Sequence, residues 1–139
     1  MQGREPLPAP EDNVYTANYF VAEDATAGVV VTEGATTEDP MVIEFAAQGD
    51  SVIFAVPETV DLSHLVSIDF DIQTAATLSL DESALPGVTI ELLDADKNPI
   101  METSTSSITT SCNPEIKYIR ITATTADTGI ALNLSLIHI

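Results

Sequence analysis

The residues that determine the architecture are Ser51-Val-Ile-Phe-Ala-Val-Pro-Glu-Thr-Val-Asp-Leu-Ser-His-Leu-Val-Ser-Ile-Asp-Phe-Asp-Ile-Gln73. In the second half of this run, apolar residues occupy every second position from 66 to 72, and polar residues separate them. Such alternation predicts a strand with one buried and one solvent-exposed face, which is typical of an antiparallel sheet. The first half, residues 51–56, predicts another strand that stops at Pro57, because proline has no N–H to donate to a sheet.

The link between these two strands, residues 57–65, is too long for a tight hairpin. It also carries three apolar residues, Val60, Leu62 and Leu65, which we expect to close one open end of a core. The pattern therefore predicts that the chain crosses here from one sheet of a sandwich to the other.

The remaining chain is predicted to form more short strands, with no helix longer than a turn. About nine or ten strands in one domain predict an all-β fold, an antiparallel β-sandwich of jelly-roll type. The last strand is expected in the middle of a sheet or paired with the first. Strands are expected near residues 29–31, 41–47, 88–93, 100–101, 103–110 (an exposed edge), 116–123 and 130–139, with tight hairpins at 48–50 and 94–99.

A length of 139 residues fits a single sandwich domain, which we place at residues 14–139. Residues 1–13 contain three prolines and no periodicity, so they are expected to be a linker or a flexible terminus. They lack the apolar stretch of a signal peptide. No apolar run approaches the roughly 18 residues of a membrane helix, so we expect no membrane insertion.

The formal charge of −18, from 22 acidic and 4 basic residues, argues against two classes of partner. Phosphate backbones and anionic lipid surfaces would be repelled, and we therefore expect no nucleic acid partner and no membrane partner. Much of the remaining polar surface is Thr, Ser, Asn and Gln. That composition suits neutral, hydroxylated ligands.

No metal site or cofactor is expected. His64 and His138 have no partner at zinc-ligand spacing, and Cys112 is expected to be a buried, inert thiol. Residues 94–98 have the D-x-D-x-N spacing of a calcium loop, but Pro99 stands where such a loop has glycine. A plain hairpin turn is the favoured interpretation, while a structural calcium built from separate loops stays open.

Catalysis is not expected either. A glycosidase needs two carboxyl groups at a set separation in a cleft. With 22 acidic residues, chance pairs are unavoidable, and the chain has no Trp to line a cleft. We therefore predict a non-catalytic module.

Two rows of outward side chains are candidates for a binding surface. Asp69, Asp71 and Gln73 alternate with apolar residues along one strand, while Tyr118 and Arg120 alternate with the isoleucines of another. Together they could form a sugar platform, in which Tyr118 stacks on pyranose C–H groups, Arg120 donates hydrogen bonds and the other three accept them. The alternative is that these side chains only shield the sheet.

A second candidate platform is the aromatic cluster of Tyr15, Tyr19 and Phe20. In the competing interpretation, Phe20 belongs to the core and the two tyrosines pack the edge of the sandwich.

Three runs carry a family resemblance. Residues 50–70, then Ile90-Glu-Leu-Leu-Asp-Ala-Asp-Lys-Asn-Pro-Ile100, then Ile116-Lys-Tyr-Ile-Arg-Ile121 are similar to β-sandwich carbohydrate-binding modules that precede xylanase catalytic domains in gut bacteria. The chain most resembles family 86, found at the amino end of a cell-attached family 10 xylanase, over about residues 40–139. It departs from the usual pattern of sugar platforms in having no Trp.

The resemblance implies non-catalytic binding of xylan or a xylo-oligosaccharide by a monomeric module of a larger enzyme. It further implies an extracellular or cell-surface location. A hypothesis from another class is a structural or adhesive surface sandwich that binds a protein partner. A protein partner would call for an exposed apolar patch, whereas a sugar site would call for solvent-facing rings.

Overall fold

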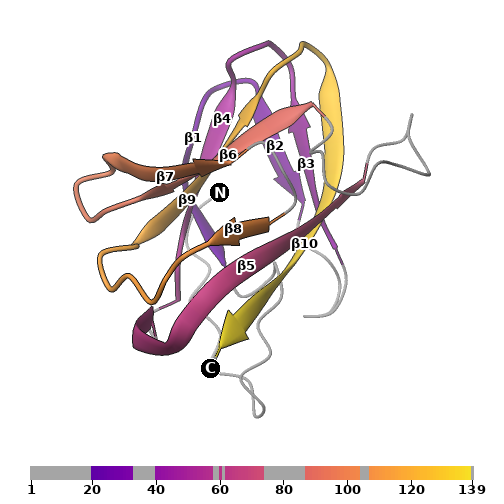
Figure 1. Ribbon diagram of the computed structural model, residues 1–139. Coiled ribbons are helices and arrows are strands. Elements are labelled where there is room, and N and C mark those ends of the chain that lie inside the picture. The colour runs from indigo at the N-terminus through magenta and orange to yellow at the C-terminus, as the bar shows by residue number, and fades with distance from the viewer. Residues whose placement is uncertain are drawn as a thin grey trace.

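The computed structural model describes residues 20–32, 40–57, 60, 62–73, 87–103 and 107–138. These residues form two five-stranded antiparallel sheets that pack face to face (Figure 1). Sheet A contains, in spatial order, β1 (Val21–Ala25), β4 (Ser51–Ala55), β9 (Tyr118–Ala123), β6 (Val88–Leu93) and β7 (Pro99–Thr103). Sheet B contains β2 (Val29–Thr32), β3 (Met41–Phe45), β10 (Thr128–His138), β5 (Leu65–Gln73) and β8 (Ser107–Thr109).

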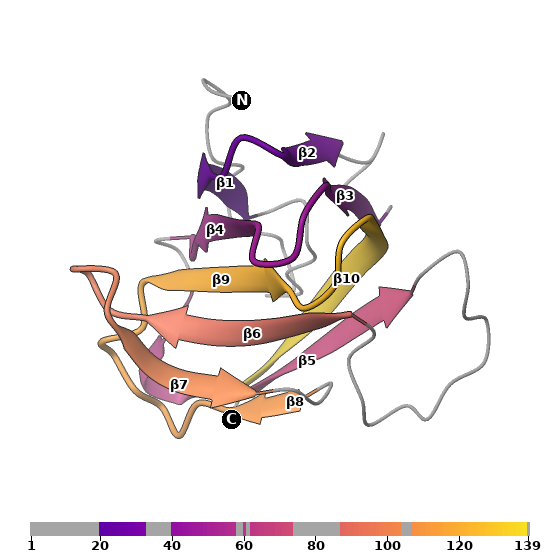
Figure 2. The ribbon, with the colours of Figure 1, turned by 90° about the horizontal axis from the view of Figure 1, so that it is seen from above.

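Strands β3 to β10 have the connectivity of a jelly roll. They form the four-stranded orders β3-β10-β5-β8 and β4-β9-β6-β7, and β1 and β2 each extend one sheet at its edge (Figure 2). Among β3 to β10, only the β6–β7 hairpin joins two neighbours in one sheet, and every other connection crosses between the layers. The predicted antiparallel jelly-roll sandwich is confirmed. So is the central position of the last strand, which lies between β3 and β5.

The crossing from β4 to β5 follows the sequence closely. A turn of 3₁₀ helix, η2 (Leu62–His64), leads directly into β5. Val60 and Leu65 are buried and Leu62 packs against the core, as the prediction of a closed core end requires. Because β4 and β5 lie in opposite sheets, the strands on either side of this link bury their apolar faces against each other.

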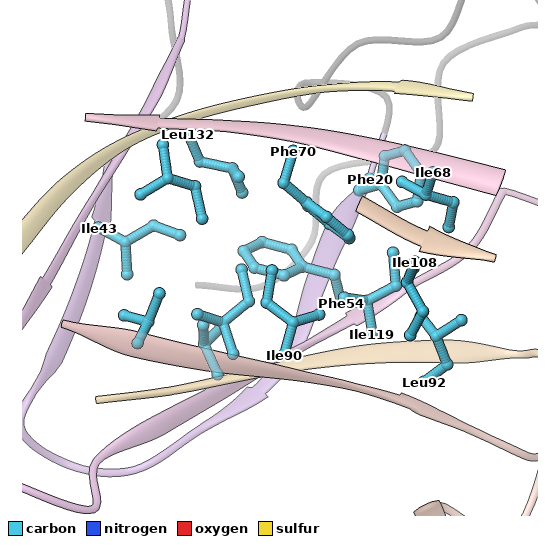
Figure 3. Close-up of a cluster of buried hydrophobic side chains, with 14 of the residues drawn as sticks. Phe20, Ile43, Phe54, Ile68, Phe70, Ile90, Leu92, Ile108, Ile119 and Leu132 are labelled. Carbon is cyan, nitrogen blue, oxygen red and sulfur yellow. The ribbon is translucent and has the colours of Figure 1, made fainter. Parts of the chain in front are cut away.

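The core fills the space between the sheets (Figure 3). Phe54 from sheet A and Phe70 from sheet B extend toward one another, and both are almost completely buried. Phe20, which precedes β1, is also buried in this cluster, so the interpretation of Phe20 as a core residue is confirmed. Inward positions on both sheets complete it, including Ile43, Ile68, Ile90, Leu92, Ile108, Ile119 and Leu132.

At one end of the sandwich, three crossings between the sheets are held together. The turns at residues 26–28 and 46–50 and the β9–β10 link are joined by hydrogen bonds from Ala46 N to Gly28 O (3.1 Å) and from Gly49 N to Ala123 O (2.9 Å). The Asp50 carboxylate adds bonds from Thr26 Oγ1 and from Ala47 N, both 2.9 Å long. A Cβ at Gly28 would collide with this carboxylate, so a larger residue there would displace the Asp50 side chain from these hydrogen bonds.

The expected tight hairpin at residues 48–50 is wrong. The chain does turn there, with Asp50 N bonded to Ala47 O (3.1 Å) and Gly49 at a φ of 92°. However, β3 and β4 belong to different sheets, so this turn is a crossing. Turn residues favour a reversal of the chain both in a hairpin and in a crossing between sheets. Which of the two forms depends on the sheet in which each flanking strand buries its apolar face.

The β6–β7 hairpin at residues 94–99 is confirmed, and so is the edge position of the strand in 103–110. That strand, β8, ends one side of sheet B.

The turn after β8 contains Cys112, which is half-buried with a φ of 58°. The prediction of a buried thiol is therefore wrong, because the chain leaves the core at Thr110 and places Cys112 in a surface turn.

Thr110 offers a test of how this turn is anchored. Its side chain is fully buried, and Oγ1 donates a 2.6 Å hydrogen bond to the Leu65 carbonyl at the start of β5. Thr110→Val keeps the shape and removes the bond, so we expect a loss of about 1 kcal/mol in the free energy of unfolding, measured by urea denaturation. Thr109→Val, on the exposed neighbour, should change it by less than about 0.5 kcal/mol. Equal effects of the two substitutions would contradict this role of Thr110.

Candidate functional site

The outer face of sheet A is centred on β9. Ile119 and Ile121 point into the core, so Tyr118 and Arg120 point outward, as their parity predicted. Both outward side chains are half-buried. Since β9 is the middle strand of the sheet, these two residues have neighbouring strands on both sides and occupy the centre of a surface. We call the surface formed by Tyr118, Arg120, Glu91 and Lys97 the Tyr118 face.

Arg120 is held by Glu91 on the adjacent strand β6. The two residues are cross-strand partners, and Arg120 Nε donates a 2.7 Å hydrogen bond to Glu91 Oε1, which Nη2 also contacts. Their side chains are 28% and 19% exposed, so the pair is partly removed from water. Glu102 on β7 lies directly opposite Glu91 in the register. Glu91 therefore lies between Arg120, which neutralises its charge, and Glu102, which repels it.

Lys97 reaches over Tyr118 from the β6–β7 turn. Its Nζ lies 5.1 Å from the centroid of the Tyr118 ring, within the range of a cation–π interaction, and 4.0 Å from Glu23 Oε1 on the edge strand β1. Lys97 thus links the β6–β7 turn to the edge strand β1 across the outer face of sheet A. Its side chain covers part of the Tyr118 ring.

The position of Lys97 is set by the turn that sequence reasoning weighed as a calcium loop. Asp94 Oδ1 accepts hydrogen bonds from Asp96 N and Asn98 N, both 2.9 Å long, and Lys97 takes a φ of 64°. This is the plain hairpin turn that was favoured, with an aspartate bonding its own backbone. Among the residues that the structure describes, no group of three or more His, Cys, Asp and Glu could hold a metal ion.

Apolar residues flank Tyr118 along the sheet. Its cross-strand partners are Ala55 on β4 and Leu93 on β6, and Leu93 is fully buried. Ile53, the partner of Arg120 on β4, is only 9% exposed. The centre of the Tyr118 face therefore has an apolar floor, with charged groups around it.

The second predicted row lies elsewhere. Asp69, Asp71 and Gln73 belong to β5 in sheet B, and Asp69 points outward and is exposed. The outer faces of the two sheets look in opposite directions, so this row and the row of Tyr118 and Arg120 do not form one platform. The alternation along each strand separates inside from outside, but it does not say which sheet the strand joins, and for that reason the combined platform was wrong.

The rest of the predicted set is only partly placed. The side chains of Asp71 and Gln73 lie outside the described part of the chain, although their backbones pair with Asn133 and Ala131 of β10. Tyr15 and Tyr19 fall outside the described residues altogether, so their cluster stays a prediction. His64 is exposed beside Ser63.

Sequence reasoning missed Glu91 and Lys97. A signal was available, because Lys97 and Arg120 are two of only four basic residues in the chain. In a protein with a net charge of −18, the few basic side chains are expected to have acidic partners nearby. Their acidic partners cannot be identified without the strand order, which places Glu91 on β6 next to Arg120 on β9.

Comparison with known proteins gives one informative result. No family model matches the chain, and no curated protein does. A solved chain from Roseburia intestinalis, described as a low affinity xylan binding module, CBM86, is similar with a TM-score of 0.60 and 14% sequence identity. The likeness covers 91% of this chain and 94% of that one. At this identity it supports the fold, the β-sandwich that the strand order shows directly.

A charge deletion tests the Arg120–Glu91 pair. Arg120→Met leaves the Glu91 carboxylate partly buried and facing Glu102, so we expect the free energy of unfolding to fall by about 1–3 kcal/mol. The double variant Arg120→Met/Glu91→Leu removes both charges and should recover most of that loss, which a double-mutant cycle in urea measures. An Arg120→Met protein as stable as the original would show that the pair has no structural role.

Proposed function

We propose that this protein is a non-catalytic module that binds a neutral plant cell-wall polysaccharide, with xylan as the first candidate, on the Tyr118 face. The observation that carries the proposal is the position of Tyr118 on the central strand of an outer face, with an apolar floor and charged hydrogen-bonding groups around it. Pyranose rings present C–H groups that pack on an aromatic ring and hydroxyls that need donors and acceptors. Both kinds of partner are present within this face.

The charges of the face favour a neutral ligand. Three acids lie on it or at its margin, Glu23, Glu91 and Glu102, against the two cations Lys97 and Arg120. An anionic polymer would meet these acids and the net charge of −18 of the whole chain. Arginine carries five donors, so the contact with Glu91 leaves others for sugar hydroxyls.

The same geometry points to weak binding. A sugar that stacks on Tyr118 must displace or share the ring with Lys97, and an exposed cation–π contact of this kind is worth about 0.5–1 kcal/mol. Ordering a flexible polysaccharide chain opposes binding further. We expect dissociation constants from micromolar to millimolar, or about −4 to −8 kcal/mol.

The fold likeness supports this proposal, because the Roseburia intestinalis chain is described as a xylan binding module. In the role that we propose, the module is a monomeric part of an extracellular or cell-surface glycoside hydrolase and keeps it near its substrate. Tethering raises the effective concentration of a weak binder, so low affinity is sufficient for targeting. Within the described residues, no helix is long and apolar enough to span a membrane.

Affinity electrophoresis through gels containing xylan, mannan, polygalacturonate or no polymer tests the proposal. We expect xylan to retard the protein and polygalacturonate not to. Tyr118→Ala should abolish most of the retardation, because it removes the aromatic surface on which the pyranose C–H groups pack, while Tyr118→Phe should keep it. Asp69→Asn, on the opposite sheet, is the matched control and should migrate like the original in xylan gels, after correction for its charge.

Two results would contradict the proposal. Retardation by no neutral polymer would exclude polysaccharide binding of this kind. Retardation that Asp69→Asn weakens and Tyr118→Ala leaves unchanged would move the site to the outer face of sheet B.

A further inference from the structure

Of the four edge strands, β2 lacks the features that usually block further pairing. β1 has a register shift between Ala22 and Asp24, β7 begins with Pro99 and has a register shift in its pairing with β6, and β8 has only three residues. β2 consists of Val29-Val-Val-Thr32, with continuous register and no charge, proline or bulge. Edges of this type are templates for another strand.

Alternate residues of β2 direct their backbone N–H and C=O groups away from β3, toward the open edge of sheet B. Ala46 N bonds to Gly28 O, which identifies residues 28 and 46 as a hydrogen-bonded pair of the β2–β3 ladder. Hydrogen-bonded pairs alternate in antiparallel strands, so Val30 and Glu44 form the next one. Val29 and Val31 therefore point their main-chain groups away from β3. The Val29 N–H donates to the Thr26 carbonyl, and within the described residues no partner strand takes the Val29 C=O or the N–H and C=O of Val31.

The side chains around this edge are apolar and acidic. Val30 and Val42, which are 55% and 41% exposed, are the exposed large hydrophobic residues in the described part of the chain, and both lie on the outer face beside this edge. A groove of about 530 Å³ runs between β1 and β2 and is lined by Glu23 and Asp24 as well as by β2. Both acids are exposed.

We propose that β2 accepts an extended, basic segment of another protein as an additional strand of sheet B. Backbone hydrogen bonds to Val31 would provide the pairing, apolar side chains of the segment would pack on the valines, and its lysines or arginines would meet Glu23, Asp24 and Glu44. The acidic surroundings select this occupant over a second copy of the chain, because pairing two β2 edges would bring two chains of charge −18 together. This edge shares only Glu23 with the margin of the Tyr118 face, and the pairing on β2 does not depend on the proposed function.

The test uses a capped peptide of alternating lysine and valine, labelled with a fluorophore, and its anisotropy with the full chain. We expect saturable binding that falls with added salt, and none with the matched peptide of alternating glutamate and valine. Val31→Pro removes the outward N–H and leaves the bonds of Val30 to β3 in place, so the affinity should drop by at least about fivefold, the equivalent of one hydrogen bond.

A second variant distinguishes a loss of binding from a folding defect caused by the proline. Val30→Lys changes an exposed side chain, keeps the backbone N–H of residue 31 and should weaken the lysine peptide by like-charge repulsion. No binding of the lysine peptide, or equal binding to the original chain and to both variants, would overturn the proposal. Concentration-dependent dimerisation of the original chain that Val31→Pro abolishes would also overturn it, because the occupant would then be a second copy.

Discussion

Phe54 and Phe70 face each other and are buried between the two sheets, and this burial fixes how the strands that carry them are placed. The two rings come from β4 and β5, which follow each other in the chain and lie in opposite sheets. Each strand has one apolar face, and burying a large apolar side chain contributes about 1.5–3 kcal/mol, so these strands are driven to face each other. Once they do, the link between them must cross the sandwich, and the outward residues of β5 and β9 must appear on opposite surfaces. The Tyr118 face is a consequence of that arrangement.

The sequence was sufficient for the features that depend on periodicity. Alternation along residues 66–72 and 118–123 gave the inward and outward positions, and the long apolar link at 57–65 gave the crossing between sheets. Which strands pair with one another was out of reach. The turn at 48–50 has the same local chemistry in a hairpin and in a crossing, and the separation of Asp69 from Tyr118 depends on the sheet that each strand joins.

The same limit explains the missing half of the candidate site. Glu91 and Arg120 are 29 residues apart in the chain and become partners only because β6 pairs with β9. Lys97 was visible as one residue of an Asp-rich turn, but its location over Tyr118 follows from how Asp94 shapes that turn. Sequence reasoning identified the aromatic residue and the arginine of the face, while the groups that restrain them came from the fold.

A sandwich of this kind offers two kinds of surface that serve different ligands. The centre of an outer face is flat, with its backbone fully paired, so a ligand there is recognised by side chains, as we propose for a sugar on Tyr118. An edge has unpaired backbone groups and suits an extended peptide, as we propose for β2. In an acidic protein the two surfaces also differ in the charge they tolerate, since a neutral sugar is compatible with the acids and a basic segment is attracted by them.

Binding of a sugar on the Tyr118 face is tested by an NMR titration of the ¹⁵N-labelled protein with xylohexaose. We expect the amide signals of β9 and β6 around Tyr118, Arg120 and Glu91 to shift progressively, together with those of the Lys97 turn, while the signals of β5 and β10 stay in place. Shifts confined to β5 and β10, or no shift at millimolar ligand, would contradict binding on this face.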